Sequence, residues 1–89
     1  MQGHQNKVKV LFFASCREMA GIKETSLYLP GDTSSTSTLR KCIVEKLPGL
    51  KPVAATITLA LNQQYIDPEQ DEPLKDGDEV AFIPPISGG

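Results

Sequence analysis

The chain has 89 residues, of which 39% are hydrophobic and 22% charged, a composition that suits one small globular domain and leaves no room for two. Its net charge of −2 and isoelectric point near 5.2 argue against a nucleic-acid-binding or anionic-membrane surface, because both require clustered Lys and Arg. No stretch approaches the roughly 18 apolar residues of a membrane span, and residues 1–8 lack the apolar run of a signal peptide. We therefore expect a cytosolic protein with neither nucleic acid nor membrane as a partner.

The first part of the chain predicts a hairpin of two strands. Residues 1–6 are polar and are predicted to be a disordered N-terminal tail. Residues 7–14 (KVKVLFFA) alternate at their start and then become apolar throughout, which is typical of a central strand covered on both faces. Residues 15–22 have mixed polarity and a turn glycine, so we interpret them as a loop. Residues 23–29 alternate again and predict the second strand.

One helix is predicted in the middle of the chain. The hydroxyl-rich residues 33–38 precede it, and one of residues 34–36 is expected to be its N-cap. The apolar residues that follow have the spacing of one helical face: Leu39, Cys42, Ile43 and Leu47. The Pro-Gly pair at 48–49 is predicted to end this helix.

The remainder of the chain predicts three more strands. Residues 56–62 alternate and predict a strand with one face in the core, and residues 65–66 predict a short edge strand. The acidic residues 67–72 are interpreted either as a solvated loop or as an attraction for a basic partner. A turn at 76–78 then leads to residues 79–83 (EVAFI), a final strand that is again apolar enough to be central.

The order of the elements is strand, strand, helix, strand, short strand, strand. We place the first and last strands side by side in the middle of one mixed sheet, because they are the most apolar. A sheet of this order packed against one main helix is the α+β β-grasp (ubiquitin-like) fold. The domain is expected to span residues 7–83 and to continue into an extended tail, residues 84–89.

The first strand predicts a partner surface as well as a core. Successive strand residues point to opposite faces of the sheet, so Leu11 and Phe13 are expected on the face away from the helix. Phe82 or Ile83 would join them, according to the parity of the last strand. An apolar outer face indicates a partner interface, and the alternative is coverage by a loop of the same chain.

The titratable residues do not assemble into a metal or nucleophilic site. Cys16 and Cys42 belong to no CxxC motif, and His4 is the single histidine. We expect no bound metal. Free cysteine behaves as a small hydrophobe in a protein core, so both thiols are expected to be non-catalytic, with a disulfide between them left open.

The C-terminal segment PPISGG contains the candidate reactive group. Pro84 and Pro85 have a fixed φ and no N–H, so they should end the sheet and project the chain outward. At about 3.3 Å per residue, residues 84–89 reach roughly 20 Å, enough to enter the active site of another protein. Gly88 and Gly89 leave the terminal carboxylate free of neighbouring side chains, which suits a carboxylate that an enzyme activates. The alternative is an inert tail.

Two stretches, LFFASCREMAG (residues 11–21) and LKDGDEVAFIPPISGG (residues 74–89), resemble the small sulfur-carrier subunits of molybdopterin synthase. The resemblance implies that an E1-like enzyme consumes ATP to adenylate Gly89, which becomes a thiocarboxylate and donates sulfur to cyclic pyranopterin monophosphate. The product is the molybdopterin dithiolene, and the carrier itself holds no cofactor. The resemblance also implies that the tail inserts into a large subunit, which supplies the catalytic side chains in a heterotetramer of two small and two large subunits. The inserted residues are Pro84, Pro85, Ile86, Ser87 and Gly88.

The resemblance adds two side-chain hypotheses and leaves other functions open. Arg17 matches an arginine of the family and is interpreted either as a partner contact or as a solvated loop charge, and Cys16 is an alternative first acceptor of sulfur. Competing functions are a thiamine-type sulfur carrier, a ubiquitin-related protein modifier or tRNA-thiolation carrier, and an interaction module with an inert tail. Only the last of these does not need the C-terminal carboxylate.

Overall fold

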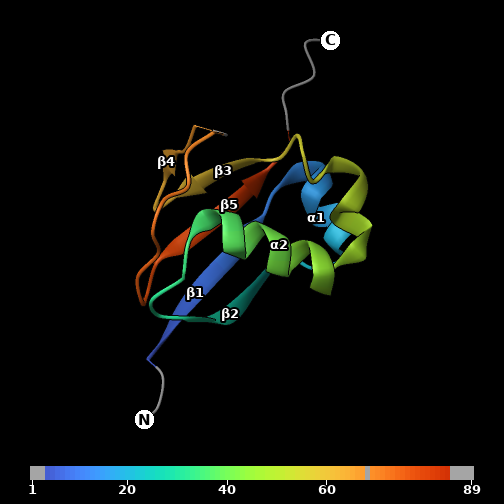
Figure 1. Cartoon of the computed structure of the whole chain (residues 1–89). Coiled ribbons are helices and arrows are strands. Elements are labelled where there is room, and N and C mark those ends of the chain that lie inside the picture. Colours follow the sequence, from blue (N-terminus) through green and yellow to red (C-terminus); the bar gives the residue numbers. More distant parts are fainter. Residues whose placement is uncertain (1–3, 68, 85–89) are drawn as a thin grey trace.

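The computed structural model describes residues 4–67 and 69–84, which form one five-stranded sheet with its main helix on one face (Figure 1). In chain order the elements are β1 (Gln5–Phe12), α1 (Ala14–Ala20), β2 (Glu24–Pro30), α2 (Thr36–Lys46), the 3-10 helix η1 (Pro48–Val53), β3 (Thr58–Leu61), β4 (Gln64–Tyr65) and β5 (Glu79–Ile83). Within the described part of the chain, no helix is long and apolar enough to cross a membrane.

The sheet has the order β2-β1-β5-β3-β4, which confirms the predicted mixed sheet of a β-grasp fold. Its two central strands, β1 and β5, run parallel, and the register pairs Val10 with Val80 and Phe12 with Phe82. The other pairs of neighbouring strands are antiparallel. The N-terminal and C-terminal strands therefore meet at the centre of the domain, as their apolar sequences predict.

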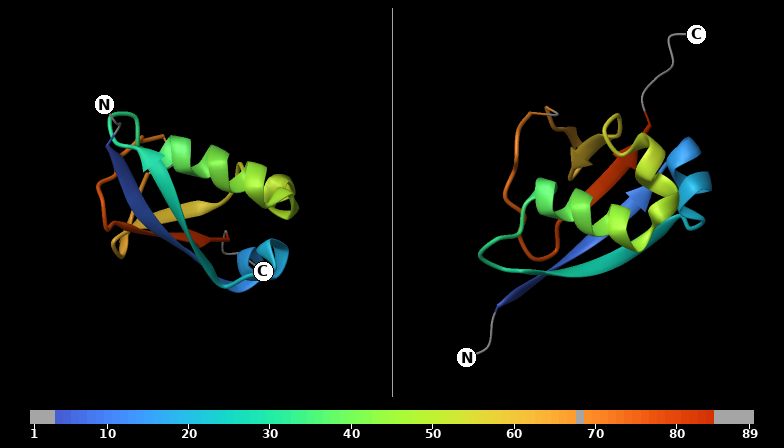
Figure 2. Two further views of the ribbon diagram at one scale, coloured as in Figure 1. Left: turned by 90° about the horizontal axis from the view of Figure 1, so that it is seen from below. Right: turned by 45° about the vertical axis from the view of Figure 1, so that its right-hand side comes forward.

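The core lies between the sheet and α2, which crosses one face of the sheet (Figure 2). Alternate residues of the central strands point into it, and the rings of Phe12 and Phe82 meet edge to face with centroids 5.6 Å apart. From the predicted face of α2, Leu39 and Ile43 are fully buried. Ser35 caps this helix, since its side chain accepts a hydrogen bond from the Thr38 N–H at 3.3 Å.

The prediction of a loop over residues 15–22 is wrong, because the chain forms the helix α1 there. Cys16 is its one fully buried side chain, so the segment shows no helical repeat of apolar residues. The glycine that indicated a turn is its C-cap: Gly21 has a φ of +80° and its N–H donates to the Arg17 carbonyl at 3.0 Å. A seven-residue helix leaves little signal beyond that glycine.

Helix α2 ends just before the Pro-Gly pair, as predicted. The chain then forms a separate 3-10 helix, η1, that was not predicted. η1 begins at Pro48, buries Leu50 and packs against α1. The Arg40 side chain spans from α2 to the residues after η1, where its Nη1 donates to the carbonyls of Ala54 at 2.6 Å and Ile57 at 3.1 Å. Helices α1 and η1 thus close one end of the domain.

The predicted N-terminal tail is too long, since β1 begins at Gln5. Asn6 is buried, and its side-chain amide donates to the Ser34 hydroxyl at 3.2 Å and to the Leu74 carbonyl at 3.1 Å. This pairing of a buried amide with two distant segments was invisible in the sequence, where Asn6 belongs to a polar run. Residues 1–3 lie outside the described residues.

The contact between α1 and η1 is close enough to be tested by one added methyl group. A Cβ at Gly49 would overlap the backbone carbonyl of Met19, so Gly49→Ala should force the two helices apart. We expect a loss of about 1–3 kcal/mol in the free energy of unfolding, measured by chemical denaturation. Lys51→Ala, on the exposed side of η1, is the control and should change it by less than about 0.5 kcal/mol. An unchanged stability of Gly49→Ala would contradict the observed packing of α1.

Candidate functional site

The face of the sheet away from α2 has a low apolar floor that runs across four strands. The register places Leu11 of β1 beside Ala81 of β5, Ala81 beside Ala60 of β3, and Ala60 beside Tyr65 of β4. Two alanines in the middle and larger side chains at both ends produce a hollow of about 260 Å³. We call this hollow the outer groove; its lining residues are Leu11, Phe13, Ala60, Gln63, Tyr65, Glu79, Ala81 and Ile83.

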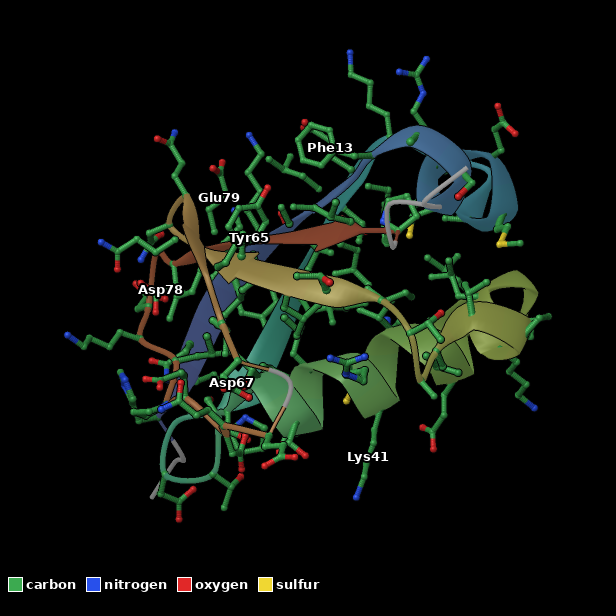
Figure 3. The ribbon with its side chains drawn as sticks, turned by 90° about the horizontal axis from the view of Figure 1, so that it is seen from above. Phe13, Lys41, Tyr65, Asp67, Asp78 and Glu79 are labelled. Carbon is green, nitrogen blue, oxygen red and sulfur yellow. The ribbon has the colours of Figure 1, made fainter. Side chains whose placement is uncertain are left out.

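The outer groove is open among the described residues, so coverage by a loop of this part of the chain is not observed. Phe13 is 47% exposed and Tyr65 is 76% exposed. Figure 3 shows both side chains, together with Glu79, on the side of the sheet opposite α2. The prediction that Leu11 and Phe13 point away from the helix is confirmed.

Of the two candidate residues of the last strand, Ile83 joins the outer groove and Phe82 does not. Phe82 is fully buried and meets Phe12 edge to face in the core, so its assignment to the partner interface is wrong. The parity follows from the parallel register, which pairs Phe82 with the inward-facing Phe12. Ile83, the next residue, must then face outward, and it is half-buried at the end of the groove.

The end of β5 is fixed from both sides. The Phe13 N–H donates to the Phe82 carbonyl at 3.1 Å, and Ile83 pairs with Thr58 of β3. Pro84 follows directly and has no N–H with which to continue the sheet. The sheet therefore releases the chain at a defined point beside the outer groove. The remaining predicted tail residues, Pro85, Ile86, Ser87, Gly88 and Gly89, lie outside the described residues.

Arg17 lies near the same end of the groove, on the exposed side of α1. A second hollow of about 240 Å³ adjoins the outer groove, and the two share Leu11 and Phe13. Arg17 and Lys23 line this second hollow together with Glu24. The structure thus brings Arg17 beside the apolar surface, and its contact with a partner stays a prediction.

The two cysteines are free thiols, and the possible disulfide does not form. Cys16 is fully buried in α1, and this burial raises the pKa of its thiol. A raised pKa keeps the thiol protonated, which argues against Cys16 as a first acceptor of sulfur, because the reactive form is the thiolate. Cys42 is half-buried on α2. The described residues contain no group of three His, Cys, Asp or Glu that could hold a metal ion.

In the acidic segment 67–72, the carboxylate of one residue is hydrogen-bonded to the start of α2. Asp71 accepts a hydrogen bond from the Ser37 N–H at 2.9 Å and so joins the loop to the first turn of α2. This backbone hydrogen bond is the main reason that the pKa of Asp71 lies below its ordinary value. Part of the acidic run is therefore a helix cap, and a role for it in attracting a basic partner stays a prediction.

Several groove residues had no functional assignment from the sequence. Ala60 and Ala81 become a floor only through the register of β3 with β5, which the alternation pattern did not specify. Tyr65 was assigned to an edge strand, and its outward direction follows from its pairing with Ala60. Gln63 lies in a turn and had no signal of its own.

Known proteins resemble this chain in both sequence and structure. The model of the ThiS family matches residues 10–89. The molybdopterin synthase sulfur carrier subunit of Chlamydomonas reinhardtii is 49% identical over 93% of this chain and 99% of its own length. The solution structure of small archaeal modifier protein 1 from Methanosarcina acetivorans has a TM-score of 0.79 at 30% identity and covers 98% of this chain and 100% of that one. A chain in the complex of subunits 1 and 2 of the molybdopterin-converting factor from Helicobacter pylori has a TM-score of 0.59 at 32% identity, with 93% of this chain and 99% of that one covered.

The burial of Cys16 predicts a large difference in reactivity between the two thiols. An alkylating reagent should modify Cys42 in the native protein and should reach Cys16 roughly 100-fold or more slowly, because Cys16 reacts only after local opening. Peptide mapping by mass spectrometry over time measures both rates in one sample. Because folding raises the pKa of the Cys16 thiol, the free energy of unfolding should decline as pH rises above the ordinary thiol range. Equal alkylation rates would contradict the burial of Cys16.

Proposed function

This chain belongs to the ThiS family, and from that premise we propose that it is the sulfur carrier subunit of molybdopterin synthase. In this proposal the Gly89 carboxylate becomes a thiocarboxylate that donates sulfur to cyclic pyranopterin monophosphate, and two such transfers build the molybdopterin dithiolene. The support is the similarity to a carrier subunit of that name, which extends over nearly the full length of both chains. The identity of 49% favours this carrier over a thiamine-type carrier.

The chemistry of the terminus requires activation by a second protein. A carboxylate is a poor acyl donor, so an E1-like enzyme would join it to AMP from ATP, releasing pyrophosphate. Hydrosulfide then displaces AMP from the transient acyl-adenylate: the acyl carbon gains a bond to sulfur, AMP leaves, and the thiocarboxylate remains. When the sulfur bonds to a substrate carbon, an oxygen substituent leaves that carbon. Water then attacks the acyl carbon and breaks its bond to sulfur, which leaves the sulfur on the substrate and restores the Gly89 carboxylate. In this cycle the carrier returns to its starting form, and it needs no bound cofactor.

The outer groove and the end of β5 share residues. This arrangement is the observation that most supports a tail that enters a partner. Ile83 lines the groove and is also the last residue of β5. Phe13 contributes its side chain to the groove and its backbone N–H to the Phe82 carbonyl. A protein that covers the groove therefore holds the domain at the point where the tail leaves it. This arrangement limits the positions that the tail can reach, which favours a productive geometry.

We propose that the large subunit of molybdopterin synthase covers the outer groove and receives the tail in its active site. The related chain in the Helicobacter pylori complex of subunits 1 and 2 supports a partner of this kind. The catalytic side chains would then belong to the large subunit, and the assembly would be a heterotetramer of two small and two large subunits. Arg17, at the rim of the groove, would contact the large subunit or the activating enzyme.

A second candidate function is that of a protein modifier, in which the activated glycine forms an isopeptide bond with a lysine of a target protein. The similarity to small archaeal modifier protein 1 supports it, because the two chains share 30% identity over almost their whole lengths. Both functions use the same activated carboxylate. They differ in the acceptor, which is sulfur in one case and an amine in the other.

Removal of Gly88 and Gly89 distinguishes these two functions, which need the terminal carboxylate, from the alternative of an inert tail. We expect the shortened chain to melt within about 2 °C of the full chain, because β5 ends at Ile83, before the deleted residues. It should form no molybdopterin when mixed with the large subunit, the activating enzyme, ATP, a sulfur donor and cyclic pyranopterin monophosphate. Deletion of residues 2–3 at the other terminus is the control and should preserve the product. Molybdopterin formation by the shortened chain would refute the proposal.

A further inference from the structure

The turn between β3 and β4 places two residues in a backbone conformation that favours glycine. Leu61 pairs with Gln64, so the loop of this hairpin consists of Asn62 and Gln63. Their φ angles are +49° and +73°, as in a type I′ turn. Asparagine tolerates this region well, whereas glutamine rarely occupies it. Gln63 therefore occupies a position where its backbone is strained.

Contacts within the domain account for an asparagine at position 62, but they do not account for a glutamine at position 63. The Asn62 side chain accepts a hydrogen bond from the Glu79 N–H and donates to the Asp78 carboxylate, both at 3.0 Å. The Gln63 side chain makes no hydrogen bond within residues 4–67 and 69–84. At the turn before β5 the chain uses glycine for the same purpose, since Gly77 has a φ of +90°. A glycine at position 63 would relieve the strain and remove nothing that the described fold uses.

Gln63 is, however, one of the lining residues of the outer groove. It lies at the β3–β4 end of the groove, with Phe13 and Ile83 among the other lining residues and Tyr65 two positions further along the chain. Its carboxamide is one of few polar groups in a lining of mainly apolar side chains. Strained residues at functional sites are retained when their side chain contributes to function.

We propose that Gln63 is a specificity-determining contact of the outer groove, with its carboxamide hydrogen-bonded to the large subunit that covers the groove. This inference rests on the proposed function. The apolar side chains provide surface that a partner can bury, but they discriminate little between one partner and another. An amide at the edge of that area adds discrimination, because a partner without a matching donor or acceptor would leave it buried and unpaired.

The test compares stability with affinity for the purified large subunit of molybdopterin synthase. Gln63→Gly should raise the Tm by roughly 2–6 °C, because it relieves the strained φ. It should nevertheless weaken binding about tenfold, as measured by titration calorimetry, because the amide contact is lost. Gln63→Ala should weaken binding to the same extent with little change in Tm, which separates the contact from the strain. Gln64→Ala is the matched control, since Gln64 neighbours Gln63 but lines a different hollow, and it should bind like the wild type.

Three outcomes would overturn the inference, and they are distinguishable. If Phe13→Ser weakens binding and both Gln63 variants bind like the wild type, the groove is the interface but Gln63 contributes no contact, so this inference alone fails. If the wild-type chain does not bind the large subunit, the proposed function fails and the inference fails with it. A loss of affinity in Gln64→Ala equal to that in Gln63→Ala would also contradict a specific role for Gln63.

Discussion

The parallel pairing of β1 with β5 is the contact on which the rest of the structure depends. It joins the two ends of the chain at the centre of the sheet, so the core cannot close until the last strand has been added. The same pairing sets the parity of β5, which sends Phe82 into the core and Ile83 to the outer face. The Phe13 N–H makes its hydrogen bond to Phe82 just beyond the end of β1. One set of backbone contacts therefore determines the core, the outer groove and the point where the tail leaves the sheet.

The two faces of the sheet differ in composition, and among the described residues only the face toward α2 is covered. On the inner face, α2 buries large side chains such as Leu39 and Ile43 against the central strands. On the outer face, Ala60 and Ala81 keep the middle of the sheet low, and the larger side chains stand around it. Helices α1 and η1 pack together at the end of the domain where β5 stops, and α1 also contacts β1 and β5. Pro84 thus follows β5 at the end of the domain that these helices close.

The sequence predicted the features that depend on long patterns. The strands, the main helix and the outward direction of Leu11 and Phe13 follow from periodicity, which reports burial directly. Helix α1 was missed because seven residues with one buried side chain give no repeat. The parity of β5 was left open because EVAFI is apolar at almost every position, so alternation could not orient it. The groove floor depends on strand register, and the strain at Gln63 depends on a backbone angle. The pattern of residue types predicts neither of them.

Sulfur carried by the terminal glycine would change the intact mass of the chain, so this mass is the measurement that we would make first. The protein should be purified gently from cells that contain its activating enzyme, and then analysed by mass spectrometry with peptide mapping. We expect a shift of about +16 Da that maps to Gly89 and disappears from that position after reaction with a thiol alkylator, which distinguishes a thiocarboxylate from oxidation. An unmodified Gly89, or Gly89 joined to lysines of other proteins in place of the thiocarboxylate, would contradict the proposed function.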